Sequence, residues 1–218
     1  MRAAHVAPVV SFELLFALGA WDLTAALTQP SALVAALGGA ALGWLAADFG
    51  SGLVHWLCDR FGDERTPLVG PLVIAPFREH HVDPQILARK DFYAATSSNA
   101  WIALALLGLW LWLGDGEPGP ERACAGSFAL TLAAAVFLTN TFHQWAHQAE
   151  PPRAARWLQR LHLAIPPERH ALHHVGGDTA YCVTTGWCNP TLDRWRFFPR
   201  LERAFARLRS ARSWEEST

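Results

Sequence analysis

The chain has 218 residues, 51% of them hydrophobic and only 17% charged, with a formal net charge of −1 at pH 7. A typical soluble domain carries about 25% charged residues, so this composition disfavours a soluble protein and favours a membrane protein with a single domain, residues 1–218. The net charge neither favours nor excludes nucleic acid as a partner until the charges are placed along the chain. The four cysteines form no CxxC pair and are interpreted as ordinary reduced thiols.

Four apolar runs follow one another along the chain. The run at 123–142 carries no formal charge over twenty residues, the length that crosses a hydrocarbon core of about 30 Å. The runs at 32–57 and 100–113 are also predicted to span. The run at 9–28 contains Glu13 and Asp22, each costly at mid-bilayer, so this run either crosses the membrane or lies at its interface. The sequence therefore predicts an all-α integral membrane protein with about four transmembrane helices.

Lysine and arginine are distributed unevenly between the loops. They crowd residues 58–95 and the chain after Arg153, whereas the turn at 114–122 holds only Arg122. Because positive residues mark the cytoplasmic side, both rich segments are expected on that side and the turn near Asp115 on the other. We therefore expect a cap on the cytoplasmic face of a membrane, the inner membrane in a bacterium.

Histidines gather beside the ends of the second and fourth runs. His55 and Asp59 are spaced i, i+4, and His143 and His147 repeat that spacing, so each pair shares one helix face. Two further clusters follow at a similar distance, which gives the layout the character of a weak internal repeat. These clusters are His80 with His81, and His170 with His173 and His174.

A lone histidine at a helix end is more often a capping or interfacial residue than a ligand, and a single HxxxH pattern carries little information. Here, however, eight of the ten histidines fall in clusters that the topology brings to one membrane face. The sequence therefore predicts a metal site within a histidine-rich cap.

The number of candidate ligands exceeds what one ion needs. A zinc site uses three or four protein ligands, whereas eight histidines and Asp59 are present. Two ions are implied. Imidazole with some carboxylate suits iron, zinc, copper or nickel, so the ligand types leave the choice of metal open.

Five segments of the chain carry a resemblance to a known family. They are HWLCDRFG at 55–62, PFREHHVDP at 76–84, HQWAHQ at 143–148, IPPERHALHH at 165–174 and YCVTTGWCNPTLD at 181–193. Together they resemble the Kua/CarF type of lipid desaturase, the plasmanylethanolamine desaturases, with a plastid fatty-acid desaturase as a more distant relative. The resemblance covers about residues 44–196.

The resemblance implies a helical membrane oxidoreductase with a di-iron centre that uses two Fe²⁺ ions, O₂ and external electrons. The electrons would come from a donor such as cytochrome b5 or ferredoxin with its reductase. In this family the substrate is a 1-O-alkyl phospholipid, which is desaturated next to the ether oxygen to give the vinyl ether of a plasmalogen.

Transferred position by position, the resemblance implies nine catalytic metal ligands. They are His55, Asp59, His80, His81, His143, His147, His170, His173 and His174. General acyl desaturases differ, because their boxes are one HxxxH and two HxxHH. Here the first box ends in aspartate and PFREHH lacks its leading histidine.

Three further polar residues are candidates for supporting the ligands. His162 matches a histidine of the family pattern but lies eight residues before His170, so it is predicted to support a ligand. Asp48 lies seven residues before His55 on the same helix face and either bonds a ligand or makes a polar contact between spans. Asn140 could orient a ligand or bridge to a metal through water.

Arginines outside the histidine clusters have two interpretations. Arg78 and Arg169 could pair with a lipid phosphate, or they could simply mark the positive side of the membrane. The tail at 197–218 interleaves arginines with aromatic residues. It is predicted to be an amphipathic helix on an anionic leaflet rather than a nucleic-acid-binding segment.

Other functions remain open from the sequence. A fatty-acyl lipid desaturase of the same di-metal type is the nearest alternative. A membrane zinc hydrolase would use a metal-bound water and fewer ligands than are present here. A non-catalytic regulator would not need the ligand set at all.

Overall fold

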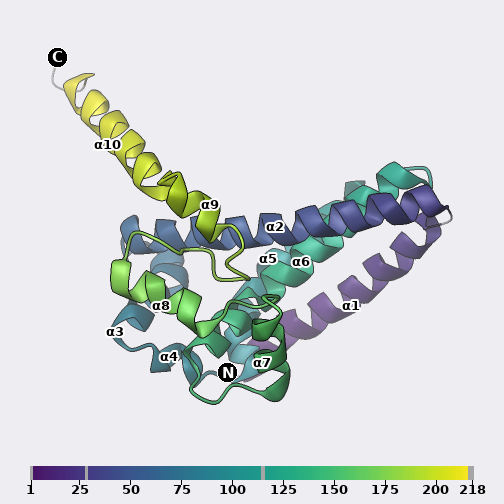
Figure 1. Cartoon of the computed structure of the whole chain (residues 1–218), viewed down its shortest axis with the longest axis horizontal. Helices are drawn as coiled ribbons and strands as arrows, with labels where there is room; N and C mark the ends of the chain where they lie inside the picture. Colours follow the sequence, from purple (N-terminus) through teal and green to yellow (C-terminus); the bar gives the residue numbers. More distant parts are fainter. Residues whose placement is uncertain (1, 28, 114–115, 216–218) are drawn as a thin grey trace.

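The computed structural model describes residues 2–27, 29–113 and 116–215, and within these ranges the chain is helical with no strand (Figure 1). Among the described residues, four helices are long and apolar enough to cross a membrane. They are α1 (Arg2–Ala26), α2 (Pro30–Arg60), α5 (Phe92–Leu113) and α6 (Pro120–His147). The predicted all-α fold with four membrane helices is therefore confirmed. The predicted turn position Asp115 lies outside the described residues.

Helix α6 contacts all three of the other long helices and packs most extensively against α2. Proline at the first turn starts both α2 and α6, where the missing N–H group costs no helical hydrogen bond. Gly43 of α2 lies so close to α6 that a Cβ atom there would collide with the backbone carbonyl of Phe128. A small residue at this position lets the two backbones approach without an intervening side chain.

Helix α1 extends from one end of the bundle to the other. Near its start, Nδ1 of His5 lies 2.9 Å from Oγ of Ser97, at the beginning of α5. Near its end, Asp22 accepts two hydrogen bonds of 2.7 and 2.8 Å from Arg122, at the beginning of α6. This arrangement favours the crossing alternative for the first run. The contact with Arg122 also compensates the charge of Asp22, which would be costly within the membrane if it were unpaired.

Short helices gather around the ends of α2 and α6, where the chain leaves the bundle (Figure 1). They are a π-helix (Gly70–Ile74), α3 (Ala75–Val82), α4 (Gln85–Ala88), α7 (Arg153–Arg160), α8 (Pro167–Gly176) and α9 (Asn189–Arg194). Together with the ends of α2 and α6, these helices form the cap.

The last helix, α10 (Phe197–Glu215), leaves the body of the molecule at an angle to α2 (Figure 1). It is attached at its base, where the buried Phe198 packs against Tyr181 and Trp56, with ring centroids 4.7 and 5.8 Å apart. The predicted amphipathic tail at 197–218 is thus helical as far as Glu215, and residues 216–218 lie outside the described part.

Candidate metal centre

All nine residues that the resemblance implies as ligands lie together in the cap, on four helices. The end of α2 supplies His55 and Asp59, and the end of α6 supplies one pair at the same i, i+4 spacing. Because residues four apart lie on one helix face, both side chains of each pair point to the same side. The remaining pair and the triplet come from short helices: His80 and His81 from α3, and His170, His173 and His174 from α8.

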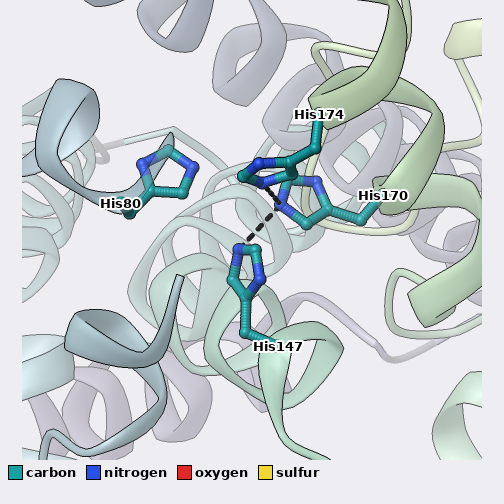
Figure 2. Close-up of side chains that lie close together, drawn as sticks. All are labelled: His80, His147, His170 and His174. Carbon is teal, nitrogen blue, oxygen red and sulfur yellow. Dashed lines mark hydrogen bonds between the residues drawn. The ribbon is translucent and has the colours of Figure 1, made fainter. Parts of the chain in front are cut away.

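One group of four consists only of imidazoles. His80, His147, His170 and His174 point toward one another, and one ring nitrogen of each lies within 4.8 Å of those of the others (Figure 2). Nε2 of His170 lies 2.9 Å from Nε2 of His147 and 3.0 Å from Nε2 of His174. We call this set the all-histidine group. Ring nitrogens that face one another at these distances suit a shared cation better than a set of hydrogen bonds, because neutral imidazole has only one N–H group.

The second group of four includes the carboxylate. It consists of His55, Asp59, His81 and His173, and we call it the Asp59 group. Oδ2 of Asp59 lies 3.2 Å from Nε2 of both His81 and His173, and 3.5 Å from Nε2 of His55. The carboxylate gives this group a negative charge that the all-histidine group lacks.

His143 lies outside these two groups of four but next to the first. Its Nε2 atom is 2.9 Å from Nε2 of His170 and 3.2 Å from Nε2 of His147. It is therefore a fifth candidate for the all-histidine group. The two groups are themselves neighbours, since the ring centroids of His81 and His174 are 4.7 Å apart.

The state of the donor atoms fits a metal centre. His55 Nε2, His80 Nε2 and Asp59 Oδ1 are buried without a hydrogen-bond partner among the described residues. Each such atom costs about 1–3 kcal/mol unless something binds it, so their concentration here is the mark of a site that accepts cations.

Burial also keeps three imidazoles of the short helices neutral, those of His80, His170 and His174. Desolvation, together with neighbouring histidines, lowers the pKa of His80 to about 3 and the pKa of His174 to about 4. The pKa of His170 lies well below its ordinary value for the same reasons. Neutral imidazole offers the lone pair that a metal needs, so these rings are ready to bind at pH 7.

Two ligands are oriented by backbone carbonyls that the sequence did not reveal. Nδ1 of His55 donates to the carbonyl of Tyr181 at 3.1 Å, and Nδ1 of His173 donates to the carbonyl of Thr179 at 2.9 Å. With the proton fixed on Nδ1, the lone pair is on Nε2, which faces the Asp59 group. Every residue has a backbone carbonyl, so the residue types do not show which carbonyls orient a ligand. The only indication of this segment was that YCVTTGWCNP is among the stretches that carry the family resemblance.

The three predicted supporting residues make other contacts. The carboxylate of Asp48 accepts backbone N–H groups of the segment 185–188 rather than bonding a ligand or a neighbouring span. The amide of Asn140 donates to Oγ of Ser98 at 3.3 Å. His162 is exposed in the turn after α7, with a left-handed φ of 55°, and belongs to neither group.

Arg78 and Arg169 make contacts within the cap. Arg78 donates to the carbonyls of Cys58 and Gly62, each at 3.2 Å, and so caps the end of α2 with a positive charge. Arg169 donates to the carbonyl of Gly186 at 3.2 Å. These hydrogen bonds give both arginines a structural role in holding the ligand-bearing helices.

An open cavity of about 380 Å³ reaches the centre. Its lining combines histidines from both groups with small apolar residues: His81, Pro84, Ala146, His147, Pro167, His170, Ala171, His174 and Val175. A small or apolar molecule could therefore approach both groups from this side.

Comparison with known proteins agrees with this site. The family model described as "Lipid desaturase domain" matches residues 44–215, which include every candidate ligand and all of α10. The chain is 38% identical over 209 residues to the plasmanylethanolamine desaturase of Myxococcus xanthus, covering 93% of this chain and 71% of the relative. It is 36% identical over 169 residues to plasmanylethanolamine desaturase 1 of Mus musculus, covering 75% and 62%.

A plant relative is somewhat more distant. The chain is 33% identical over 179 residues to the chloroplastic fatty acid desaturase 4 of Arabidopsis thaliana, covering 80% of this chain and 53% of the relative. The match thus spans less than two thirds of the mouse and plant proteins. No solved structure matches the chain. The family model and the bacterial relative together show that the chain belongs to the lipid desaturase family of membrane oxidoreductases.

Proposed function

We propose that this protein introduces a vinyl ether double bond into the 1-O-alkyl chain of an ether phospholipid, at a di-iron centre. The observation that carries the proposal is the convergence of two neighbouring ligand groups at one end of a bundle of membrane helices. Similarity to plasmanylethanolamine desaturases from a bacterium and a mammal supports the choice of reaction.

The two groups divide the ligands between two irons. The all-histidine group would hold one iron, with His143 beside it, and the Asp59 group would hold the other. Iron bound there would activate O₂ with electrons from a donor such as cytochrome b5 or ferredoxin with its reductase. Desaturation removes two hydrogens from the alkyl chain. These hydrogens, together with two electrons and two protons supplied from outside, reduce one O₂ to two waters, so the reaction balances.

The protein's own part in the reaction is to bind, position and exclude water. Burial keeps His80 and His174 neutral, so protons do not compete with iron for their nitrogens at pH 7. The apolar side of the cavity, with Pro84 and Ala146, would hold the alkyl chain beside both groups and limit the access of water.

The membrane setting follows from the same bundle. We propose that residues 1–218 form one membrane domain whose cap lies on the cytoplasmic face, in the inner membrane of a bacterium. The support is the crowding of lysine and arginine in the cap segments. The partners would be the ether phospholipid and the electron donor, with no nucleic acid.

Desaturation of a fatty-acyl chain is the second candidate. It is favoured by the plant relative, whose name is that of a fatty acid desaturase. The same ligand groups would serve either reaction, since only the position of the chain beside the metals differs.

Lipid analysis separates the two candidates. The chain would be expressed in a host that contains 1-O-alkyl phospholipids but no plasmalogens, and the lipids would be analysed by mass spectrometry before and after acid treatment. We expect acid-labile vinyl ethers, and none from a His173→Ala, His174→Ala double variant at equal protein level. New acyl double bonds without vinyl ethers would support the second candidate. The absence of both products would contradict both candidates.

A further inference from the structure

The segment from Thr179 to Cys188, here called the return segment, follows α8 and runs back against α2. Its contact with α2 is close, because a Cβ atom on Gly52 would lie 2.5 Å from Sγ of Cys182. The carbonyls of residues 179 and 181 in this segment accept the hydrogen bonds from His173 and His55. The orientation of these two ligands therefore depends on where the return segment lies.

Asp48 fastens the other end of the return segment to α2. Its side chain is fully buried, and Oδ1 accepts the backbone N–H groups of Thr185 at 2.7 Å and Gly186 at 2.8 Å. Oδ2 accepts the N–H group of Cys188 at 2.9 Å. A carboxylate inside a membrane helix is costly unless it is fully hydrogen-bonded, and bonds to an ionised acceptor are the stronger kind. Asp48 thus accepts hydrogen bonds from three backbone N–H groups, which no neutral side chain of the same size could satisfy together.

Weaker anchors lie between Asp48 and the two carbonyls. Oγ of Ser51 accepts the N–H group of Val183 at 3.0 Å. The side chain of Asn189 accepts the N–H group of Cys182 at 2.8 Å and donates to its carbonyl at 2.9 Å. A continuous set of hydrogen bonds therefore leads from α2 along the return segment to the carbonyls that orient the ligands.

This support is unequal between the two groups. Both histidines held by the return segment, His55 and His173, belong to the Asp59 group. In the all-histidine group, by contrast, Nδ1 of His170 has no partner among the described residues. A change in the return segment should therefore disturb the metal of the Asp59 group more strongly than the other.

We propose that Asp48 is a positioning residue for the metal ion of the Asp59 group. By fixing the return segment against α2, it keeps two backbone carbonyls where they direct Nε2 of His55 and of His173 toward that ion. Partners of this kind set the tautomer and angle of a ligating ring, and their loss typically weakens metal binding about 10- to 100-fold. The inference rests on the proposed function, because it requires two bound ions.

The test is the iron content of the full-length Asp48→Asn protein in lipid nanodiscs. Asparagine keeps the shape but leaves one acceptor oxygen for three donors, so we expect about one iron per chain where the parent holds about two. The iron that remains should be lost when His147→Ala is added and kept when His173→Ala is added. Hydrogen exchange should also become faster at the amides of residues 185, 186 and 188.

Asp22→Asn is the matched control, because Asp22 is an acid of a membrane helix at the opposite end of the bundle, and it should leave both irons in place. If Asp48→Asn does not accumulate, Ser51→Ala removes a single anchor and should still weaken the iron of the Asp59 group several-fold. Unchanged iron affinity in whichever variant is folded would overturn the role of Asp48 while leaving the proposed function intact. Fewer than two irons in the parent protein would instead overturn the two-metal centre.

Discussion

Asp59 is the only carboxylate among the nine candidate ligands, and its surroundings fit the ligand role proposed for it. Its side chain is 12% exposed and faces three imidazole nitrogens. The neighbouring Arg60 forms its ion pair with Asp178 instead. An exposed pair with Arg60 would have contributed only about 0–1 kcal/mol, whereas this arrangement places the charge within the candidate metal site.

We expect Asp59→Asn to reduce vinyl ether formation by at least about tenfold, because the negative charge that helps to bind one iron is lost. Product per unit of protein, measured by mass spectrometry, checks this. Asp59→His should be less damaging, since it restores a donor atom. Normal product from Asp59→Ala at equal protein level would remove Asp59 from the site.

His173 and His174 are adjacent in sequence but belong to different groups. We therefore expect His173→Ala to weaken one iron and His174→Ala the other, with the double variant losing both. Iron analysis of the purified proteins measures this. Two controls are His5→Ala and His162→Ala, because the first side chain contacts Ser97 and the second is exposed. A double variant with full iron content would show that this cluster does not bind metal.

At the scale of elements, α10 supports the cap through its first turn. We expect Phe198→Ala to lower the free energy of unfolding by about 3–5 kcal/mol, because this ring is 1% exposed and packs between Trp56 and Tyr181. Thermal unfolding followed by circular dichroism checks the loss. Phe205→Ala should cost less, since Phe205 is 41% exposed, and an equal loss from both would contradict a role specific to the base of α10.

The elements differ in how far the sequence could predict them. The spans were predictable from uncharged apolar runs, and the candidate ligands from i, i+4 spacing and the resemblance. The crossing of α1 stayed open because Asp22 is paired with Arg122, a hundred residues away. The grouping of ligands was not predictable either, since spacing and the weak repeat do not show which residues share an ion. In the structure, α3 and α8 each contribute to both groups.

At the scale of the molecule, the distribution of charge predicts the orientation in the membrane. In a variant without its native cysteines, we expect a cysteine at Val175 to be protected from an impermeant reagent in intact cells and one at Gly116 to be modified. Val175 is suitable because it is 90% exposed. Gly177 is not, because its φ of 66° disfavours other residues. The opposite labelling pattern would place the cap on the outer side.

Both groups of four include residues from α8, the last of the ligand-bearing helices in the chain. During synthesis the ribosome must therefore deliver residues 170–174 before either group is complete, by which time all four long helices have been made. A nascent chain that ends after α3 would carry His55, Asp59, His80 and His81 but neither complete group. Metal loading at the proposed centre would thus be a late event in biogenesis, and we expect a chain truncated before α8 to insert into the membrane without acquiring either ion.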